Sequence, residues 1–168
     1  MDERHEHEQY FFDAPTLAHL AGVAAAYPNP CCLCAPRLGQ ELERRGVAVR
    51  TLDIDTRFAG LAGFRRYDVF RPEWLGEPFG LILCDPPFFR VSLAQLFTAV
   101  RLLSRYDYRQ PLLISYLSRR ATNILGTFAR FDLQPTGYYP GYLTVQNVER
   151  NGIEFFGNLV VGHDDFAG

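Results

Sequence analysis

Short apolar runs alternate along this chain with segments in which apolar residues recur at every third or fourth position. A short continuous run is typical of a strand buried on both faces, and the wider spacing is typical of a helix with one buried face. One helix is expected to start near residues 13–16. The other expected helices are 37–45, 91–105 and 118–131, and the expected strands are 31–34, 47–55, 64–70, 81–84, 111–117 and 153–161. This alternation predicts an α/β fold with a doubly wound, Rossmann-like, mostly parallel sheet and right-handed crossovers.

The two ends of the chain depart from this regular pattern. Asn151-Gly152 is the strongest hairpin signal and directly precedes the last expected strand. We therefore predict a C-terminal antiparallel hairpin, with one reversed strand at an edge of the sheet. Residues 1–9 are charged and rich in histidine, and we expect them to form a flexible tail. No repeat or linker interrupts residues 10–168, which are predicted to form a single domain.

The composition narrows the class of protein. With 168 residues and 48% apolar content, the chain is long and apolar enough for one sizeable core. No apolar run approaches the roughly 20 residues that span a bilayer, and no signal-peptide pattern opens the chain. We therefore expect a cytoplasmic protein without a membrane partner. The net charge of −2 excludes a general polyanion binder, although all 17 basic residues are arginines, which recognise phosphate well.

The four cysteines are interpreted as core residues. Cys31, Cys32 and Cys34 lie in one expected strand, and Cys84 lies in another. Zinc sites prefer cysteine pairs in turns, whereas a free cysteine is a common small residue of a core. The sequence therefore predicts no structural metal.

Residues 81–88 contain the strongest candidate for a functional motif. The apolar run 81–84 leads directly into Asp85-Pro86-Pro87-Phe88, where the two prolines end the strand because neither can donate to a ladder. Asp85 is thus expected at the carboxyl end of a central strand, where open α/β sheets place their ligands. A carboxylate, a rigid Pro86 carbonyl and the Phe88 ring can together hold a planar or cationic amine. The alternative is an ordinary loop in which Asp85 caps a helix and Phe88 fills the core.

Other acids also fall at strand ends. Asp53 and Asp55 follow the second expected strand, and Asp68 lies near the end of the third. These strand ends share one rim of a doubly wound sheet, and an acid after the second strand commonly binds ribose hydroxyls. No glycine-rich phosphate-binding loop follows the first strand. A nucleoside ligand without phosphates fits best, and S-adenosylmethionine (SAM) is such a ligand.

An ordered set of segments resembles the N6-adenine-methyltransferase-like family. The set comprises Gln9-Tyr10-Phe11-Phe12 with Thr16, Cys34-Ala35-Pro36-Arg37-Leu38, Leu52-Asp53-Ile54-Asp55-Thr56-Arg57-Phe58, Tyr67-Asp68 and Asp85-Pro86-Pro87-Phe88. That family includes a CCHC zinc-finger ribosomal RNA N6-adenine methyltransferase and the elongation factor 1-alpha lysine methyltransferases. The resemblance implies a seven-stranded class I SAM-dependent methyltransferase fold.

The resemblance also implies the roles of site residues. Asp53 or Asp55 would bind the ribose of SAM and Asp68 the adenine, while Asp85, Pro86, Pro87 and Phe88 would bind the accepting amine. Further cofactor contacts are implied for Tyr10, Phe12, Thr16, Ala35, Pro36, Arg37, Leu38, Arg57 and Asp85.

Three functions follow from these expectations. The first is N6-adenine methylation of RNA, because the Ala35–Leu38 loop and the Phe after Pro-Pro look more like the RNA enzyme. The chain has no CCHC segment, so methylation of a protein lysine on a translation component is the alternative. In either reaction catalysis would consist mostly of positioning, with Tyr138, Tyr139 and Tyr142 as candidates for the acceptor channel. The third is a non-catalytic SAM-binding partner subunit, against which the intact Asp-Pro-Pro-Phe argues.

Overall fold

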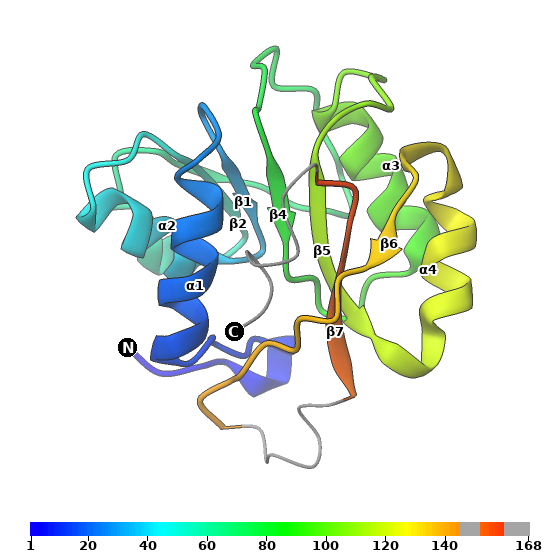
Figure 1. Cartoon of the computed structure of the whole chain (residues 1–168). Coiled ribbons are helices and arrows are strands. Elements are labelled where there is room, and N and C mark those ends of the chain that lie inside the picture. Colours follow the sequence, from blue (N-terminus) through cyan, green and yellow to red (C-terminus); the bar gives the residue numbers. More distant parts are fainter. Residues whose placement is uncertain (145–151, 160–168) are drawn as a thin grey trace.

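The computed structural model describes residues 1–144 and 152–159. In these ranges one mixed sheet has the strand order β3-β2-β1-β4-β5-β7-β6 (Figure 1). Neighbouring strands from β3 to β5 are parallel, and β7 is antiparallel to both β5 and β6. The strands are β1 (Cys31–Leu33), β2 (Arg50–Asp53), β3 (Phe64–Arg66), β4 (Ile82–Cys84), β5 (Leu112–Leu117), β6 (Gln134–Pro135) and β7 (Ile153–Gly157). This is the seven-stranded, doubly wound α/β fold that was predicted.

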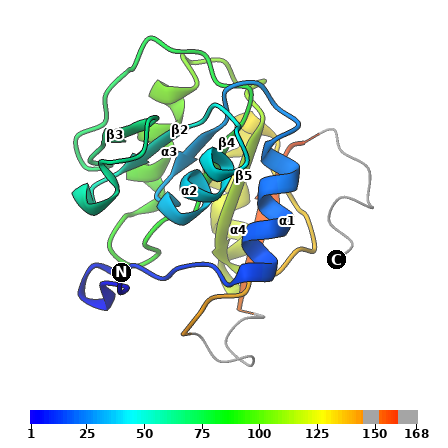
Figure 2. The ribbon, with the colours of Figure 1, turned by 90° about the vertical axis from the view of Figure 1, so that its left-hand side faces the viewer.

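Four α-helices among the described residues cover the two faces of the sheet. Helices α1 and α2 lie on one face, and α3 and α4 lie on the other, as Figures 1 and 2 show. They are α1 (Ala14–Ala24), α2 (Pro36–Arg44), α3 (Leu93–Leu103) and α4 (Ala121–Thr127). The short 3₁₀ helices are η1 (His5–His7), η2 (Thr56–Phe58), η3 (Ser118–Arg120) and η4 (Ala129–Phe131).

The alternation of side chains along β4 explains why both faces are covered. Leu83 joins the core under α1 and α2, whereas Ile82 and Cys84 join the core under α3 and α4. All three are fully buried, as expected for a central parallel strand with helices on both sides. Asp85 leaves this strand directly at its carboxyl end.

Local signals fix the ends of the first helices. The Asp13 side chain accepts a hydrogen bond from the Thr16 N–H and so caps α1. Helix α2 starts with Pro36 and is followed by Gly46 at φ 79°, a left-handed conformation that favours glycine.

Several expected boundaries were wrong. The expected helix 118–131 is divided into η3, α4 and η4. Phe128 and Phe131 both pack against Phe97, and a 3₁₀ turn brings residues three apart onto one side. The expected strands 47–55 and 64–70 are both shorter in the structure. Strand β2 ends at Asp53 because Asp55 already caps η2.

The reversed strand also lies elsewhere than expected. Strand β7 is inserted between β5 and β6, and β6 forms the edge of the sheet. Part of the predicted hairpin, including Asn151, and residues 160–161 of the expected last strand lie outside the described residues.

The structure also bears on the expectations for membrane spans and for the cysteines. Within residues 1–144 and 152–159, no helix is long and apolar enough to cross a membrane. A cytoplasmic location stays a prediction. The four cysteines carry free thiols, and those of Cys31, Cys32 and Cys84 are fully buried.

Candidate active site

A cavity of about 1050 Å³ opens where β1, β2 and β4 end. Cys34, Asp53 and Asp85 line it from these three strand ends. Strands β1 and β4 are neighbours in the sheet although two strands separate them in the chain, so the strand order reverses here. In open α/β sheets, ligands bind at this reversal point.

Asp85 is held by two hydroxyl groups. The Ser115 Oγ–H donates to Oδ1 over 2.6 Å, and the Tyr142 hydroxyl donates to the same oxygen over 2.7 Å. Burial raises the pKa of Asp85 to about 7, the two hydrogen bonds oppose that rise, and the charge of Asp53 adds to it. Within the described part of the chain, Oδ2 accepts no hydrogen bond.

The backbone after Asp85 is fixed by the fold. The Asp85 N–H donates to the Leu33 carbonyl over 3.1 Å, and the Pro87 carbonyl accepts from the Val91 N–H over 3.1 Å. The Pro86 carbonyl accepts no hydrogen bond from residues 1–144 or 152–159. Phe88 lines the cavity and meets the edge of the Tyr116 ring at a centroid distance of 5.7 Å.

Asp53 and Asp55 have opposite electrostatic environments. Burial raises the pKa of Asp53 to about 6, although the Asp55 N–H donates to it over 2.8 Å. The pKa of Asp55 is lowered against the effect of burial, because Arg57 and Gln9 both donate to its carboxylate. Asp55 is therefore occupied by protein donors, whereas no side chain among the described residues bonds to Asp53.

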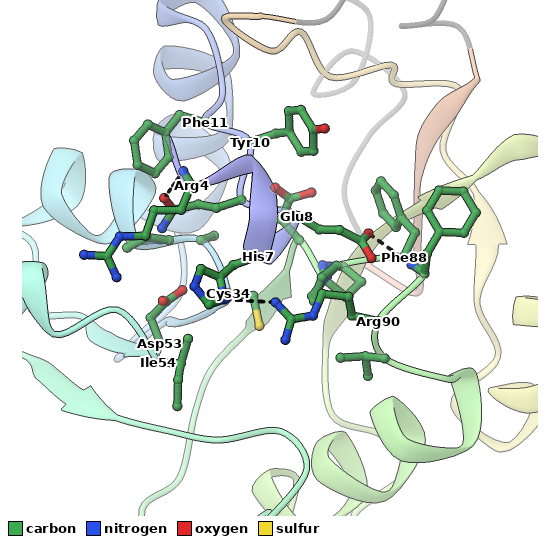
Figure 3. Close-up of a pocket in the computed structure, with 18 of the residues that line it drawn as sticks. Arg4, His7, Glu8, Tyr10, Phe11, Cys34, Asp53, Ile54, Phe88 and Arg90 are labelled. Atoms are coloured by element: carbon green, nitrogen blue, oxygen red, sulfur yellow. Dashed lines mark hydrogen bonds between the residues drawn. The ribbon is translucent and has the colours of Figure 1, made fainter. Parts of the chain in front are cut away.

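The N-terminal residues cross the cavity. Figure 3 shows His7 and Glu8 lying over it, between Asp53 on one side and Phe88 with Arg90 on the other. The Glu8 carboxylate accepts from the Phe89 N–H over 3.1 Å, and the Arg90 guanidinium lies 3.0 Å from His7 Nδ1. The segment expected to be a flexible tail thus contacts the loop that follows Asp85.

The structure places most of the predicted site residues around this one cavity. Thr16 does not line it, because its hydroxyl accepts the Gly141 N–H at the base of α1. Leu38 is fully buried in the core, and within residues 1–144 and 152–159 the Arg57 side chain donates only to Asp55 and Gln9. The lining contains these predicted residues: Tyr10, Phe12, Ala35, Pro36, Arg37, Asp53, Asp55, Asp68, Asp85, Pro86, Pro87 and Phe88.

Several lining residues were not predicted from the sequence. Among the three candidate tyrosines only Tyr142 lines the cavity, whereas Tyr138 stacks on His19 and Tyr139 is exposed. The hydrogen bond of Ser115 to Asp85 could not be read from the chain, since the register of β4 and β5 creates it. Further lining residues that were not predicted are Arg4, His5, His7, Glu8, Gln9, Cys34, Tyr67, Val69 and Phe70.

The residues present fit SAM. The cavity holds a buried carboxylate without a side-chain partner among the described residues, Asp53, at the strand end where nucleosides are bound. Its wall combines apolar groups such as Ile54 and Val69 with the polar Asp68. A nucleoside joined to an amino-acid chain requires this mixture of apolar and acceptor groups.

Three comparisons with known proteins bear on this site. The search of solved structures finds magnesium protoporphyrin IX methyltransferase of Synechocystis PCC 6803 with bound SAM, at 13% identity and TM-score 0.56, covering 86% of this chain and 79% of that one. A TehB-like SAM-dependent methyltransferase of Corynebacterium glutamicum is similar at 18% identity and TM-score 0.52, over 86% of each chain. Protein 1320 of Thermoplasma acidophilum matches at 15% identity and TM-score 0.51, over 96% and 100% of the chains. The search of curated proteins finds no match.

These likenesses confirm the methyltransferase fold. The family comparison goes further, because the profile described as "Probable N6-adenine methyltransferase" matches residues 3–158, most of the chain. The protein is a SAM-dependent methyltransferase, with SAM as its cofactor. The chain belongs to the probable N6-adenine methyltransferase family.

Proposed function

We propose that this enzyme methylates the exocyclic amino group of an adenine in RNA. The observation that carries the proposal is the pair of acceptors, Asp85 Oδ2 and the Pro86 carbonyl, beside the half-buried ring of Phe88. A primary amino group on an aromatic ring has two N–H donors in one plane, which match two acceptors next to a stacking surface. The adenine must be single-stranded or flipped out of a helix to reach them.

We further propose that Asp53 binds the ribose hydroxyls of SAM. Asp55 cannot do so as readily, because Arg57 and Gln9 already bond to its carboxylate. Asp68 lines the same side of the cavity, where it would accept from the adenine amino group of SAM. The remaining predicted contacts come from Tyr10, Phe12 and the segment Ala35–Arg37.

The chemistry is a direct displacement. SAM supplies an electrophilic methyl group on its sulfonium. The nitrogen lone pair forms the new N–C bond while the C–S bond breaks and its electron pair stays on sulfur. Asp85 and the Pro86 carbonyl orient the nitrogen and stabilise the positive charge that grows on it. One N–H proton then leaves the nitrogen, and the Asp85 carboxylate or water accepts it.

Methylation of a protein lysine is the second candidate. The half-buried carboxylate of Asp85 could pair with an ammonium group, and Phe88 could cover it by a cation–π contact. The lysine must lose a proton before it attacks. Arg90 and the exposed Arg119 at the cavity favour the RNA proposal, because arginine binds phosphate bidentately.

The test uses tritiated SAM with purified enzyme and a lysate of host cells that lack their own copy. Label that RNase removes supports adenine methylation, and steep salt dependence of the reaction would agree with phosphate contacts. Label that protease removes contradicts RNA and makes lysine the acceptor. Asp85→Ala should lose turnover while still binding SAM, and Asp107→Asn, on an exposed loop far from the cavity, is the matched control.

A further inference from the structure

Two hydroxyl groups meet on one oxygen of Asp85. Ser115 lies on β5, and Tyr142 lies in the segment between β6 and β7. The sequence places them 30 and 57 residues from Asp85, yet both donate to Oδ1 at 2.6 and 2.7 Å. Both donors are buried, with 0% and 3% exposure, so each hydroxyl approaches Asp85 from the protein interior.

Tyr142 is itself held firmly. Its ring stacks on Phe12 at a centroid distance of 5.3 Å, and its backbone forms a bridge to the same residue. The Leu143 N–H donates to the Phe11 carbonyl, and the Asp13 N–H donates to the Gly141 carbonyl. The N-terminal stretch around Phe12 therefore fixes the position of the Tyr142 hydroxyl against Asp85.

We propose that Ser115 and Tyr142 are positioning residues that select which oxygen of Asp85 faces the accepting amine, and that they favour the ionised form of this carboxyl over the protonated form. The inference rests on the proposed role of Asp85 as an acceptor. Two donors fill the lone pairs of Oδ1, so only Oδ2 is left for the amine. A proton on Asp85 would go to Oδ2, and that oxygen would then donate and turn away the N–H groups it must accept.

Other titratable groups lie near Asp85 and could also contribute to the pH dependence of kcat. Asp53 at the end of β2 raises the pKa of Asp85 by its charge. Burial raises the pKa of Tyr142 well above its usual range, and burial does the same for the Cys84 thiol on β4, so both stay protonated. His7, Glu8 and Arg90 line the same cavity from the N-terminal segment and from the loop after Asp85.

The first experiment measures the Asp85 carboxyl without cofactor or substrate. The enzyme is labelled at the aspartate side-chain carbon, its signal is assigned through Asp85→Asn, and the titration is followed by NMR. Removing a donor in Tyr142→Phe or Ser115→Ala should raise the pKa of Asp85 by about one unit, since a charged acceptor loses a strong hydrogen bond. Tyr108→Phe and Ser104→Ala are matched controls far from the cavity and should leave it unchanged.

The second experiment measures kcat against pH. With the pKa of Asp85 one unit higher, kcat should fall about five-fold at pH 7 and recover to within about two-fold of the wild-type enzyme at pH 9. The KM for SAM should stay within about two-fold. A residue that only supports the fold would lower kcat equally at both pH values, so this result would overturn the proposal.

A third variant tests the choice of oxygen. In Asp85→Asn, Ser115 and Tyr142 should keep the amide oxygen, which leaves the NH₂ group facing the amine and lowers kcat more than 100-fold at every pH. Substantial activity of this variant, or an unchanged Asp85 titration in both hydroxyl variants, would contradict the proposal. If the wild-type enzyme methylates neither RNA nor protein, the acceptor role fails, and the NMR titration still decides whether the two hydroxyls favour the ionised form of Asp85.

Discussion

The burial of Asp85 affects the stability of the folded protein as well as the proposed acceptor site. Burial raises its pKa to about 7, so the folded protein binds a proton there between about pH 4 and pH 7 that the unfolded chain has already lost. The free energy of unfolding therefore falls as the pH rises through this window. The penalty is absent below about pH 4 and complete above pH 7, with an upper limit of about 4 kcal/mol.

Asp85→Asn should remove this penalty. The amide stays neutral and keeps the hydrogen bonds of Ser115 and Tyr142, so the variant should be more stable than the wild-type protein at pH 8. The difference should shrink towards pH 4. Denaturant unfolding at several pH values measures it, and a difference that does not vary with pH would show that Asp85 is not the titrating group.

Asp53 and Asp55 stand two residues apart and should respond differently to substitution. Asp53→Asn removes the carboxylate proposed to bind ribose, and we expect the Kd for SAM to rise at least about ten-fold, which corresponds to about 1.4 kcal/mol. Asp55→Asn breaks the bonds to Arg57 and Gln9 and should mainly lower stability. Calorimetric titration with SAM measures both variants. A larger loss of affinity in Asp55→Asn would assign the ribose to that residue instead.

The helix that follows the acceptor loop is fixed by its first residues. Ser92 accepts from the Gln95 N–H, and the Gln95 side chain accepts from the Ser92 N–H, which forms a capping box at the start of α3. Ser92→Ala should lower the free energy of unfolding by about 1 kcal/mol. Because the cap lies outside the cavity, the Kd for SAM should not change, and a thermal melt with a parallel SAM titration checks both points.

The elements show how far local sequence determines this fold. Buried runs such as 81–84 were predicted correctly, because the hydrophobic pattern acts within a few residues. The insertion of β7 between β5 and β6 was not predicted, because strand order depends on contacts between residues that are distant in the chain. The same limit applies to the site. The motif predicted that Asp85 lies at a strand end, and it lines the cavity there. The contact of Ser115 with Asp85 depends on the pairing of β4 with β5, which the sequence does not reveal.

At the scale of the whole molecule, the first nine residues connect the two halves of the cavity. On the cofactor side Gln9 donates to Asp55, and the Arg37 guanidinium donates to the Met1 carbonyl. On the acceptor side Glu8 accepts from the Phe89 N–H. Figure 3 shows His7 and Glu8 of this segment lying over the cavity, between Asp53 on one side and Phe88 with Arg90 on the other. We therefore infer that these residues act as a cover over the bound cofactor.

Deleting residues 2–8 should raise the Kd for SAM about ten-fold and speed its dissociation, because the cofactor loses its cover and Phe89 loses its partner Glu8. The melting temperature should change little, since η1 contributes no buried residue to either core. Stopped-flow dissociation of SAM and a thermal melt measure the two effects. Glu6→Gln, which changes a charge in the same segment outside the cavity lining, is the control. An unchanged Kd in the deletion would instead favour the flexible tail expected from the sequence, with no part in cofactor binding.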